Sequence, residues 1–165
     1  MREHVTKQYV SLAFFELLKE KPFEAIKVSD VVKKAGISRA SFYRNYLDLE
    51  QIIEEYLEQF FTVKISFTDI RDLVYQTLSL YYQNQDILLL LYKRKLLDRF
   101  DHVMYENVLK EIQERKVFNN KYQPYFFSGA AIGFIRGWIE NSFEETPEVM
   151  SDLFIQSLKG YMKVD

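Results

Sequence analysis

The sequence predicts an all-α-helical protein. Apolar residues recur at spacings of three and four positions along nearly the whole chain, which is the period of amphipathic helices. No segment combines the alternating apolar and polar pattern of a half-buried strand with a hairpin turn. The 165 residues include only five glycines and three prolines, so few positions interrupt a helix.

The length of the chain fits one ordinary domain, or a small head on a larger body. Hydrophobic residues make up 48 % and charged residues 28 % of the sequence, a balance that argues against disorder for most of it. The absence of cysteine excludes disulfide bonds and thiolate metal sites and fits a reducing compartment. The N-terminus lacks the apolar core of a signal peptide, and the longest aliphatic run, residues 87–91, is too short to span a bilayer. We therefore expect a cytoplasmic protein outside the membrane.

The first helix is predicted over residues 3–20. Pro22 follows it and cannot continue a helix. The spacing of apolar residues predicts one buried face on this helix. That face consists of Val5, Tyr9, Leu12, Ala13 and Leu17.

Two short helices follow, over about residues 29–35 and 39–45. Ser29 and Ser38 are candidate N-caps, because a serine oxygen can accept a hydrogen bond from the first turn. Gly36 lies between the two helices, where glycine can adopt a left-handed turn at no steric cost. The segment therefore predicts a tight helix–turn–helix connection.

A fourth helix is predicted from Asp48 to about Phe61, and the rest of the chain continues as helices. We place a domain boundary between residues 47 and 48, so that residues 1–47 form a head and residues 48–165 form a helical body. The helices of the body after the fourth are expected over about 67–83, 86–97, 99–116, 123–144 and 147–162.

The second helix of such a pair usually enters the major groove of DNA. Phe42 and Tyr46 are spaced to pack together on the inner side of this helix, which leaves its polar residues outside. Arginine, serine and the alanine methyl can contact base edges, whereas lysine and hydroxyl groups suit phosphate oxygens. The predicted DNA-contacting residues are Lys27, Ser29, Ser38, Arg39, Ala40, Ser41, Tyr43, Arg44 and Asn45.

The same pattern also fits a three-helix bundle with a solvated charged face. The net charge of −2 is not typical of a nucleic-acid-binding protein. Its distribution is slightly asymmetric, with +2 in residues 1–50 and −4 in the remainder. This suits a mildly basic head on an acidic body.

Residues 9–57 resemble the N-terminal domain of the tetracycline-repressor (TetR) family of transcriptional regulators. The matching run is IKVSDVVKKAGISRASFYRNYLDLEQII, and its most specific parts are residues 35–38 and 42–44. Two positions depart from the family pattern. Tyr46 stands where phenylalanine is commoner, and Leu49 stands where the family usually has a lysine that holds the DNA backbone.

The resemblance implies a homodimeric repressor with a three-helix, helix-turn-helix DNA-binding domain and a C-terminal helical domain for dimerisation and ligand binding. Each subunit would offer one recognition helix to a palindromic operator in double-stranded DNA. The two half-sites would lie about one helical turn apart, or a multiple of ~34–36 Å. A small effector in the body would release the repressor by changing the distance between the two helices.

Three glycines repeat at every fourth position on the helix predicted over residues 123–144. Each costs about 1 kcal/mol relative to alanine inside a helix, so a stripe of them indicates close approach of another backbone. That backbone could belong to the same subunit or to a second one. The resemblance favours a second subunit, since family members dimerise through their last two long helices. The predicted interface residues are Gly129, Gly133, Gly137, Phe154 and Leu158.

The body is rich in aromatic residues, for which ordinary core packing is the simplest explanation. The alternative is the mostly apolar effector pocket that the resemblance implies, for an apolar or aromatic small molecule. The Gly137-Trp138 pair followed by Pro147 also resembles the C-terminal domain of a TetR subgroup, some members of which bind a protein co-regulator instead. A protein partner is therefore a further alternative for this chain. The predicted pocket residues are Tyr75, Tyr82, Tyr92, Phe100, Tyr105, Phe134 and Trp138.

The sequence does not predict an enzyme, a metal site or a cofactor. His4 and His102 are far apart in the sequence, and there is no glycine-rich phosphate loop or other catalytic motif. A helical interaction protein that has kept the fold but lost DNA binding remains an alternative. Salt dependence would separate the two, because DNA binding weakens steeply as salt rises.

Overall fold

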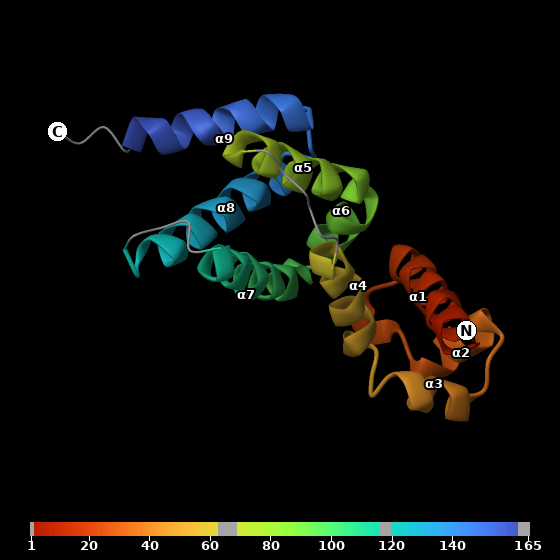
Figure 1. Ribbon diagram of the computed structural model, residues 1–165. Coiled ribbons are helices and arrows are strands. Elements are labelled where there is room, and N and C mark those ends of the chain that lie inside the picture. Colours follow the sequence, from red (N-terminus) through yellow and green to blue (C-terminus); the bar gives the residue numbers. More distant parts are fainter. Residues whose placement is uncertain (1, 63–68, 116–119, 162–165) are drawn as a thin grey trace.

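The computed structural model describes residues 2–62, 69–115 and 120–161. All regular structure in these ranges is helical, which confirms the predicted all-α fold (Figure 1). The helices are α1 (Arg2–Glu20), the 3-10 helix η1 (Phe23–Ala25), α2 (Val28–Ala35), α3 (Arg39–Asn45), α4 (Glu50–Thr62), α5 (Ile70–Gln83), α6 (Gln85–Lys93), α7 (Leu97–Arg115), α8 (Gln123–Glu140) and α9 (Pro147–Tyr161).

The helices form a small head and a larger body (Figure 1). In the head, α1 contacts α2, α3 and α4. In the body, α5 packs on α9, α7 packs on α8, and α6 contacts α5, α7 and α8. Helix α4 touches both parts, because it packs on α1 in the head and on α7 in the body. Helix α3 lies at the end of the molecule away from α8 and α9 (Figure 1).

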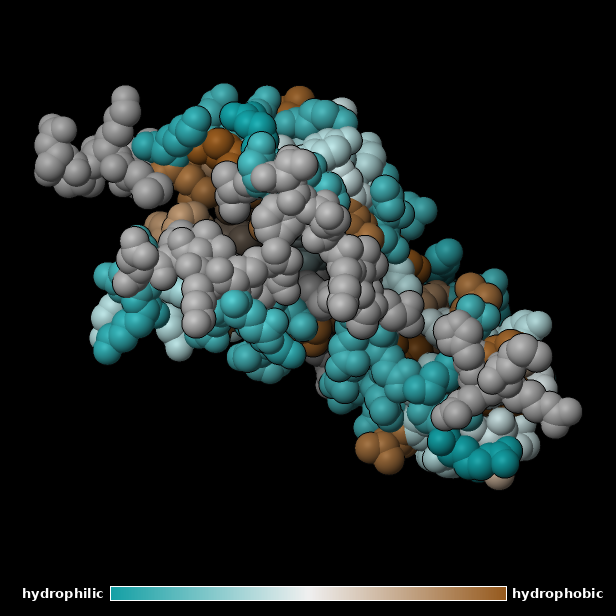
Figure 2. Space-filling model, viewed as in Figure 1, coloured by the Kyte–Doolittle hydropathy of each residue, from teal (hydrophilic) through white to brown (hydrophobic). Residues whose placement is uncertain are grey.

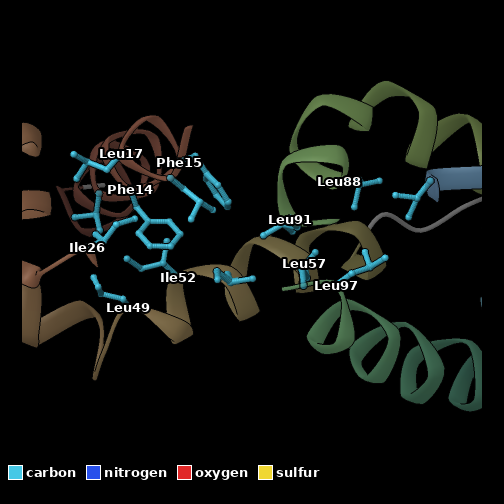
Figure 3. Close-up of a cluster of buried hydrophobic side chains, with 14 of the residues drawn as sticks. Phe14, Phe15, Leu17, Ile26, Leu49, Ile52, Leu57, Leu88, Leu91 and Leu97 are labelled. Carbon is cyan, nitrogen blue, oxygen red and sulfur yellow. The ribbon is translucent and has the colours of Figure 1, made fainter. Parts of the chain in front are cut away.

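One hydrophobic core runs through both parts along α4 (Figure 3). On the head side, Phe14 and Ile52 are 0 % and 1 % exposed. On the body side, Leu57, Leu88 and Leu91 are fully buried. Apolar packing thus joins the head to the body, since α4 contributes side chains to both ends of the same core.

The predicted buried face of α1 was wrong for three of its five residues. Val5, Tyr9 and Leu12 are exposed, and only Ala13 and Leu17 are buried as expected. Helix α1 carries apolar residues on more than one side, so periodicity alone could not choose between two stripes. Contacts with α2, α3 and α4 select the other stripe. The buried residues of α1 are Val10, Ala13, Phe14, Phe15, Leu17 and Leu18.

Helix α8 ends at Glu140 and not near residue 144 as expected. Ser142 and Phe143 have positive φ values of 57° and 55°, which end the helix and turn the chain toward α9. Such values are unusual for residues other than glycine. Phe143 is buried and packs edge-to-face on Trp138, with the ring centroids 4.8 Å apart. This packing offsets the strain of the turn, and it could not be read from local sequence.

Because three tyrosine hydroxyls are shielded from solvent, we expect the free energy of unfolding to fall at alkaline pH. Burial raises the pKa of the Tyr46, Tyr56 and Tyr81 hydroxyls above the usual value of 10.0. Above that pH the unfolded chain releases these protons and the folded chain retains them. The free energy of unfolding should therefore be unaffected by them below pH 10.0 and fall as the pH rises further, by up to about 1.4 kcal/mol per pH unit for each tyrosine.

Urea denaturation on both sides of pH 10.0 would measure this loss. Lysine ion pairs also weaken in alkali, so the Tyr46→Phe variant serves as the comparison. Its stability should fall less steeply than that of the wild type. Equal slopes for the two proteins would contradict the prediction for Tyr46.

Candidate nucleic-acid interface

The turn between α2 and α3 consists of three residues and depends on Gly36. Gly36 has a φ of 67°, in the left-handed region that glycine adopts most easily. Its amide donates to the Lys33 carbonyl oxygen at 3.4 Å, and the Ile37 amide donates to the Val32 carbonyl oxygen at 3.0 Å. These bonds close the end of α2, as in the usual glycine-terminated helix. The predicted turn conformation is confirmed.

Helix α3 begins at Arg39, and Ser38 caps it as expected. The Ser38 Oγ atom accepts a hydrogen bond from the Ser41 amide at 3.1 Å. Phe42 is fully buried and Tyr46 is 4 % exposed, with their ring centroids 5.7 Å apart. The Tyr46 hydroxyl also reaches the Lys7 carbonyl oxygen in α1 at 3.5 Å. The two aromatic rings thus hold α3 against the head and turn its other side outward.

The predicted DNA-contacting residues divide into an exposed group and a half-buried group. Ser29, Ser41 and Asn45 are the half-buried ones. The Asn45 side-chain amide donates to the Ser41 carbonyl oxygen at 2.7 Å, so its donor is engaged in its own helix. The exposed residues are Lys27, Ser38, Arg39, Ala40, Tyr43 and Arg44.

Ser29 is not the N-cap of α2, contrary to expectation. The N-cap is Lys27, whose amide donates to the Asp30 carboxylate at 3.1 Å, so that Ser29 lies within the first turn. Lys21 also donates to Asp30, at 2.6 Å, and this bond lowers the pKa of the Asp30 carboxyl more than the Lys27 amide does. An aspartate two residues after the start of a helix can thus replace a serine cap.

Ion pairs inside the head neutralise several of its cations. Lys7 pairs with Glu55 at 2.9 Å and Lys21 with Asp30 at 2.6 Å. Lys34 pairs with Glu16 and Glu20 at 3.2 and 3.0 Å. In the described part of the chain, the exposed cations of α2 and α3 that make no ion pair are Lys33, Arg39 and Arg44, with Lys27 at the N-cap of α2.

The loop between α3 and α4 contains one buried and one exposed leucine. Leu49, at the position where the resemblance places a lysine, is 9 % exposed and lies in the core near Phe14 and Ile52 (Figure 3). Leu47 is 80 % exposed, and its amide donates to the Gln51 Oε1 atom at 2.7 Å. Most of the head surface around this loop is hydrophilic (Figure 2). Leu47 was not predicted as a site residue, because nothing in the sequence distinguishes an exposed apolar residue next to α3 from a buried one.

The Ser38 cap allows stability and DNA contact to be separated. Ser38→Ala removes the acceptor for the Ser41 amide, so the free energy of unfolding should fall by about 0.5–2 kcal/mol. Ser38→Asp keeps an acceptor but places a negative charge where phosphates would lie. Urea denaturation should therefore show near-wild-type stability for Ser38→Asp. A DNA titration of the same variant should show weakened binding. Wild-type stability in Ser38→Ala would contradict the capping role.

The glycine stripe of α8 faces open space with respect to the described residues of its own subunit. A Cβ atom added at Gly129, Gly133 or Gly137 would meet none of their atoms within 4 Å. Tyr122 and Phe126 lie on the same side of the helix by its 3.6-residue period, and they are 67 % and 60 % exposed. Among the described residues, no backbone of the same subunit approaches the stripe closely enough to explain it.

The two interface residues predicted on α9 face inward more than expected. The Phe154 ring packs edge-to-face on Phe134, with the centroids 5.1 Å apart, and Leu158 is half-buried. The exposed large apolar residues of α9 are Val149 and Leu153. The sequence places Leu153 on the apolar face of this helix together with Phe154 and Leu158, but it did not single out Val149, because α9 is apolar on two sides.

The predicted pocket residues are distributed over several packing contacts. The Tyr82 and Trp138 rings stack at 5.7 Å, and the Trp138 indole donates to the Glu145 carbonyl oxygen at 3.2 Å. Tyr75 is exposed and donates to the Glu148 carboxylate at 3.1 Å, which joins α5 to α9. Tyr92 and Tyr105 are half-buried, and Phe134 packs on Phe154. The side chain of Phe100 lies outside the described part of the structure.

The residues that the structure describes contain no helix long and apolar enough to cross a bilayer. Nor do they contain a group of three histidine, cysteine or carboxylate side chains arranged for a metal ion.

Comparisons with known proteins agree with this architecture. Residues 13–56 match the family described as bacterial regulatory proteins, tetR family. Residues 68–160 match a TetR family described as the transcriptional regulator C-terminal region. A search of the curated proteins gives no significant match.

The fold also resembles a solved structure, described as a TetR transcriptional regulator from Streptococcus agalactiae 2603V. The TM-score is 0.66 at 22 % sequence identity, and the match covers 94 % of each chain. At this identity the likeness concerns the fold, whereas the family follows from the two sequence matches. The chain belongs to the TetR family of bacterial transcriptional regulators, which are DNA-binding proteins and not enzymes.

Proposed function

We propose that the protein is a cytoplasmic homodimeric repressor that binds a palindromic operator through α3 of each subunit. The observation that carries this proposal is the outer surface of α3, where Arg39, Ala40, Tyr43 and Arg44 are exposed on a helix held by two buried aromatic rings. A side chain that reads a base must be held in place by its helix, and this arrangement supplies that support.

The contacts to DNA divide by their chemistry. Arg39 and Arg44 carry guanidinium groups that can bind guanine with two hydrogen bonds, and Ala40 offers a methyl group to thymine. Lys27, Ser38 and Tyr43 suit the phosphate backbone. We assign base reading to the first group and positioning on the backbone to the second.

Dimerisation is proposed through the outer face of α8 together with α9. Exposed glycines with open space around them permit a second helix to approach closely, and exposed aromatic residues on the same face supply apolar area. In a twofold interface each patch meets its own copy in reverse order. Tyr122 and Phe126 of one subunit would then lie toward Gly133 and Gly137 of the other. On α9, Val149 and Leu153 are better placed for the interface than Phe154 and Leu158.

An apolar small molecule bound in the body is proposed to release the repressor. Aromatic residues of α5 and α8, such as Tyr82 and Trp138, lie next to each other there. A ligand that separated such rings would move α5 and α8, and with them the dimer face. The effect on DNA would come from the altered separation of the two copies of α3.

Selection from randomised double-stranded DNA tests the proposal, with the mass of the protein measured in the same buffer. A dimeric protein that enriches a palindrome with half-sites about one helical turn apart would support it. Specific binding should weaken steeply as salt rises, through release of counterions. Folded, dimeric protein that enriches no sequence would contradict it and favour a helical interaction protein.

A further inference from the structure

The contact between α1 of the head and the end of α6 in the body, called the joint below, contains a charged side chain. This side chain is not among the predicted DNA-contacting residues. Arg94 directly follows α6, in the body. Its Nε atom donates to the carbonyl oxygen of Leu18, and its Nη2 atom donates to that of Lys19, both at 2.8 Å. Both acceptors belong to the last turn of α1, in the head. One guanidinium group therefore connects parts of the chain 76 and 75 residues apart.

These two bonds satisfy a need at the end of α1. The last four carbonyl groups of a helix have no partner within it, and they form the negative end of the helix dipole. A guanidinium group matches them in charge, and its planar fork donates in two fixed directions. Arg94 thus binds the end of α1 in a defined orientation, which an apolar contact would not impose.

The rest of the joint is mostly apolar. Leu18 of α1 and Leu91 of α6 are fully buried, and α1 contacts α6 directly. The Phe15 and Tyr56 rings lie 4.7 Å apart, and the Tyr56 hydroxyl contacts the Asn84 Oδ1 atom at 3.2 Å. Apolar surfaces hold two parts together without fixing a direction, because the hydrophobic effect is non-directional.

The backbone beneath Arg94 is itself anchored. Its amide donates to the Leu90 carbonyl oxygen at 3.0 Å, and the Leu96 amide donates to that of Leu91 at 2.9 Å. Between them Lys95 has a φ of 57°, which ends α6 sharply. The backbone that carries the guanidinium group is therefore fixed by hydrogen bonds to the end of α6, so the group keeps a fixed position relative to α6.

We infer that Arg94 is a positioning residue that sets the angle of the head on the body, and thereby the separation of the two copies of α3. The inference rests on the proposed dimeric function, in which both copies of α3 must meet the major groove at one spacing. Without the fork, α1 remains packed on α6 by its apolar residues but can rotate on it. The two copies of α3 could then reach operators with several half-site spacings, but they would bind each of them less tightly.

The first test compares operators with different spacing. The readout is the ratio of affinities for the selected operator and for the same operator with one base pair inserted at its centre. This ratio should fall at least about fivefold in Arg94→Ala, the lower end of usual coupling energies. Arg94→Gln, which keeps a donor but not the fork, should lie between. Partial unfolding affects both affinities alike, so it cancels in the ratio.

The control is Arg71→Ala, which removes an exposed arginine that pairs with Asp152 between α5 and α9. It also breaks a contact between distant segments, but one away from the joint. Its affinity ratio should equal that of the wild type. An equal fall in both variants would overturn the inference, because any weakening of the body would then suffice.

The second test needs no DNA. Since the chain has no cysteine, Glu24→Cys on the exposed surface of η1 gives one spin label per head. The distribution of distances between the two labels in the dimer should be broader in Arg94→Ala than in the wild type or in Arg71→Ala. An unchanged width would overturn the inference, as would a broader width with an unchanged affinity ratio.

The two proposals can fail separately. A dimeric wild type that ignores operator spacing would contradict the proposed function, while the label distances would still decide the role of Arg94 in holding the head. A monomeric wild type would overturn both. A wild type with a clear spacing preference that Arg94→Ala retains would overturn this inference alone.

Discussion

Gly133→Leu is expected to convert the dimer into monomers and to abolish operator binding at concentrations where the wild type binds. The structure separates folding from assembly in this test, since a Cβ atom at Gly133 meets none of the described atoms of its own subunit within 4 Å. Replacing glycine by leucine in a helix should also stabilise the isolated subunit, by somewhat under about 1 kcal/mol. Any loss of assembly must therefore come from a clash with the second subunit.

Analytical ultracentrifugation and thermal unfolding together would check this prediction. The variant should sediment as a folded monomer whose helix content equals that of the wild type. Glu106→Leu, on the exposed side of α7, is a control for adding leucine to a helix surface, and it should remain dimeric. A dimer of wild-type affinity in Gly133→Leu would place the interface elsewhere.

Arg39→Ala is expected to cause the largest loss of sequence-specific binding. A bidentate contact between arginine and guanine contributes about 1–3 kcal/mol of discrimination. A twofold dimer loses two such contacts, or about 2–6 kcal/mol, which is a factor of roughly 30 to more than 10,000 in affinity. Arg39 is exposed and makes no ion pair among the described residues, so its removal should not weaken the fold.

Titration of the operator and of unrelated DNA would separate reading from positioning. Arg39→Ala should bind the operator much more weakly and unrelated DNA almost normally. Lys27→Ala, as a phosphate contact, should weaken both and should lower the salt dependence by about two ions per dimer. An equal loss on both DNAs for Arg39→Ala would identify Arg39 as a phosphate contact.

Ion pairs within the head limit the number of positive charges that are available for binding DNA. The positive charges of Lys7, Lys21 and Lys34 are matched by carboxylates within the head. Leu49 is buried, at the position where the family resemblance leads one to expect a lysine that holds the DNA backbone. Few cations therefore remain for general attraction to DNA, so we expect the proposed base contacts of Arg39 and Arg44 to supply a large share of the binding energy.

The sequence by itself determined the fold class, the turn at Gly36, the cap at Ser38 and the inward position of Phe42 and Tyr46. Each of these depends on interactions between residues at most four positions apart. A left-handed turn requires glycine, a capping oxygen must precede the first turn, and residues at i and i+4 share one helix face. Such local rules can be read without knowledge of the rest of the chain.

Tertiary structure alone decided which side of a helix is buried where two sides are apolar. Val5, Tyr9 and Leu12 are exposed on α1 because the other stripe meets α2, α3 and α4. Phe154 faces Phe134 on α8, so Val149 and Leu153 are left on the outer face of α9. The choice depends on contacts with distant segments, whose free energy exceeds any local preference.

The bonds from Arg94 to α1 show the same limit most clearly. Nothing within several residues of Arg94 indicates that its guanidinium group meets carbonyl oxygens 75 and 76 residues earlier in the chain. An exposed arginine after a helix usually interacts with its own helix end or with water. The packing of α6 on α1 brings the guanidinium group to the carbonyl oxygens of Leu18 and Lys19, because that packing places the end of α6 next to the end of α1.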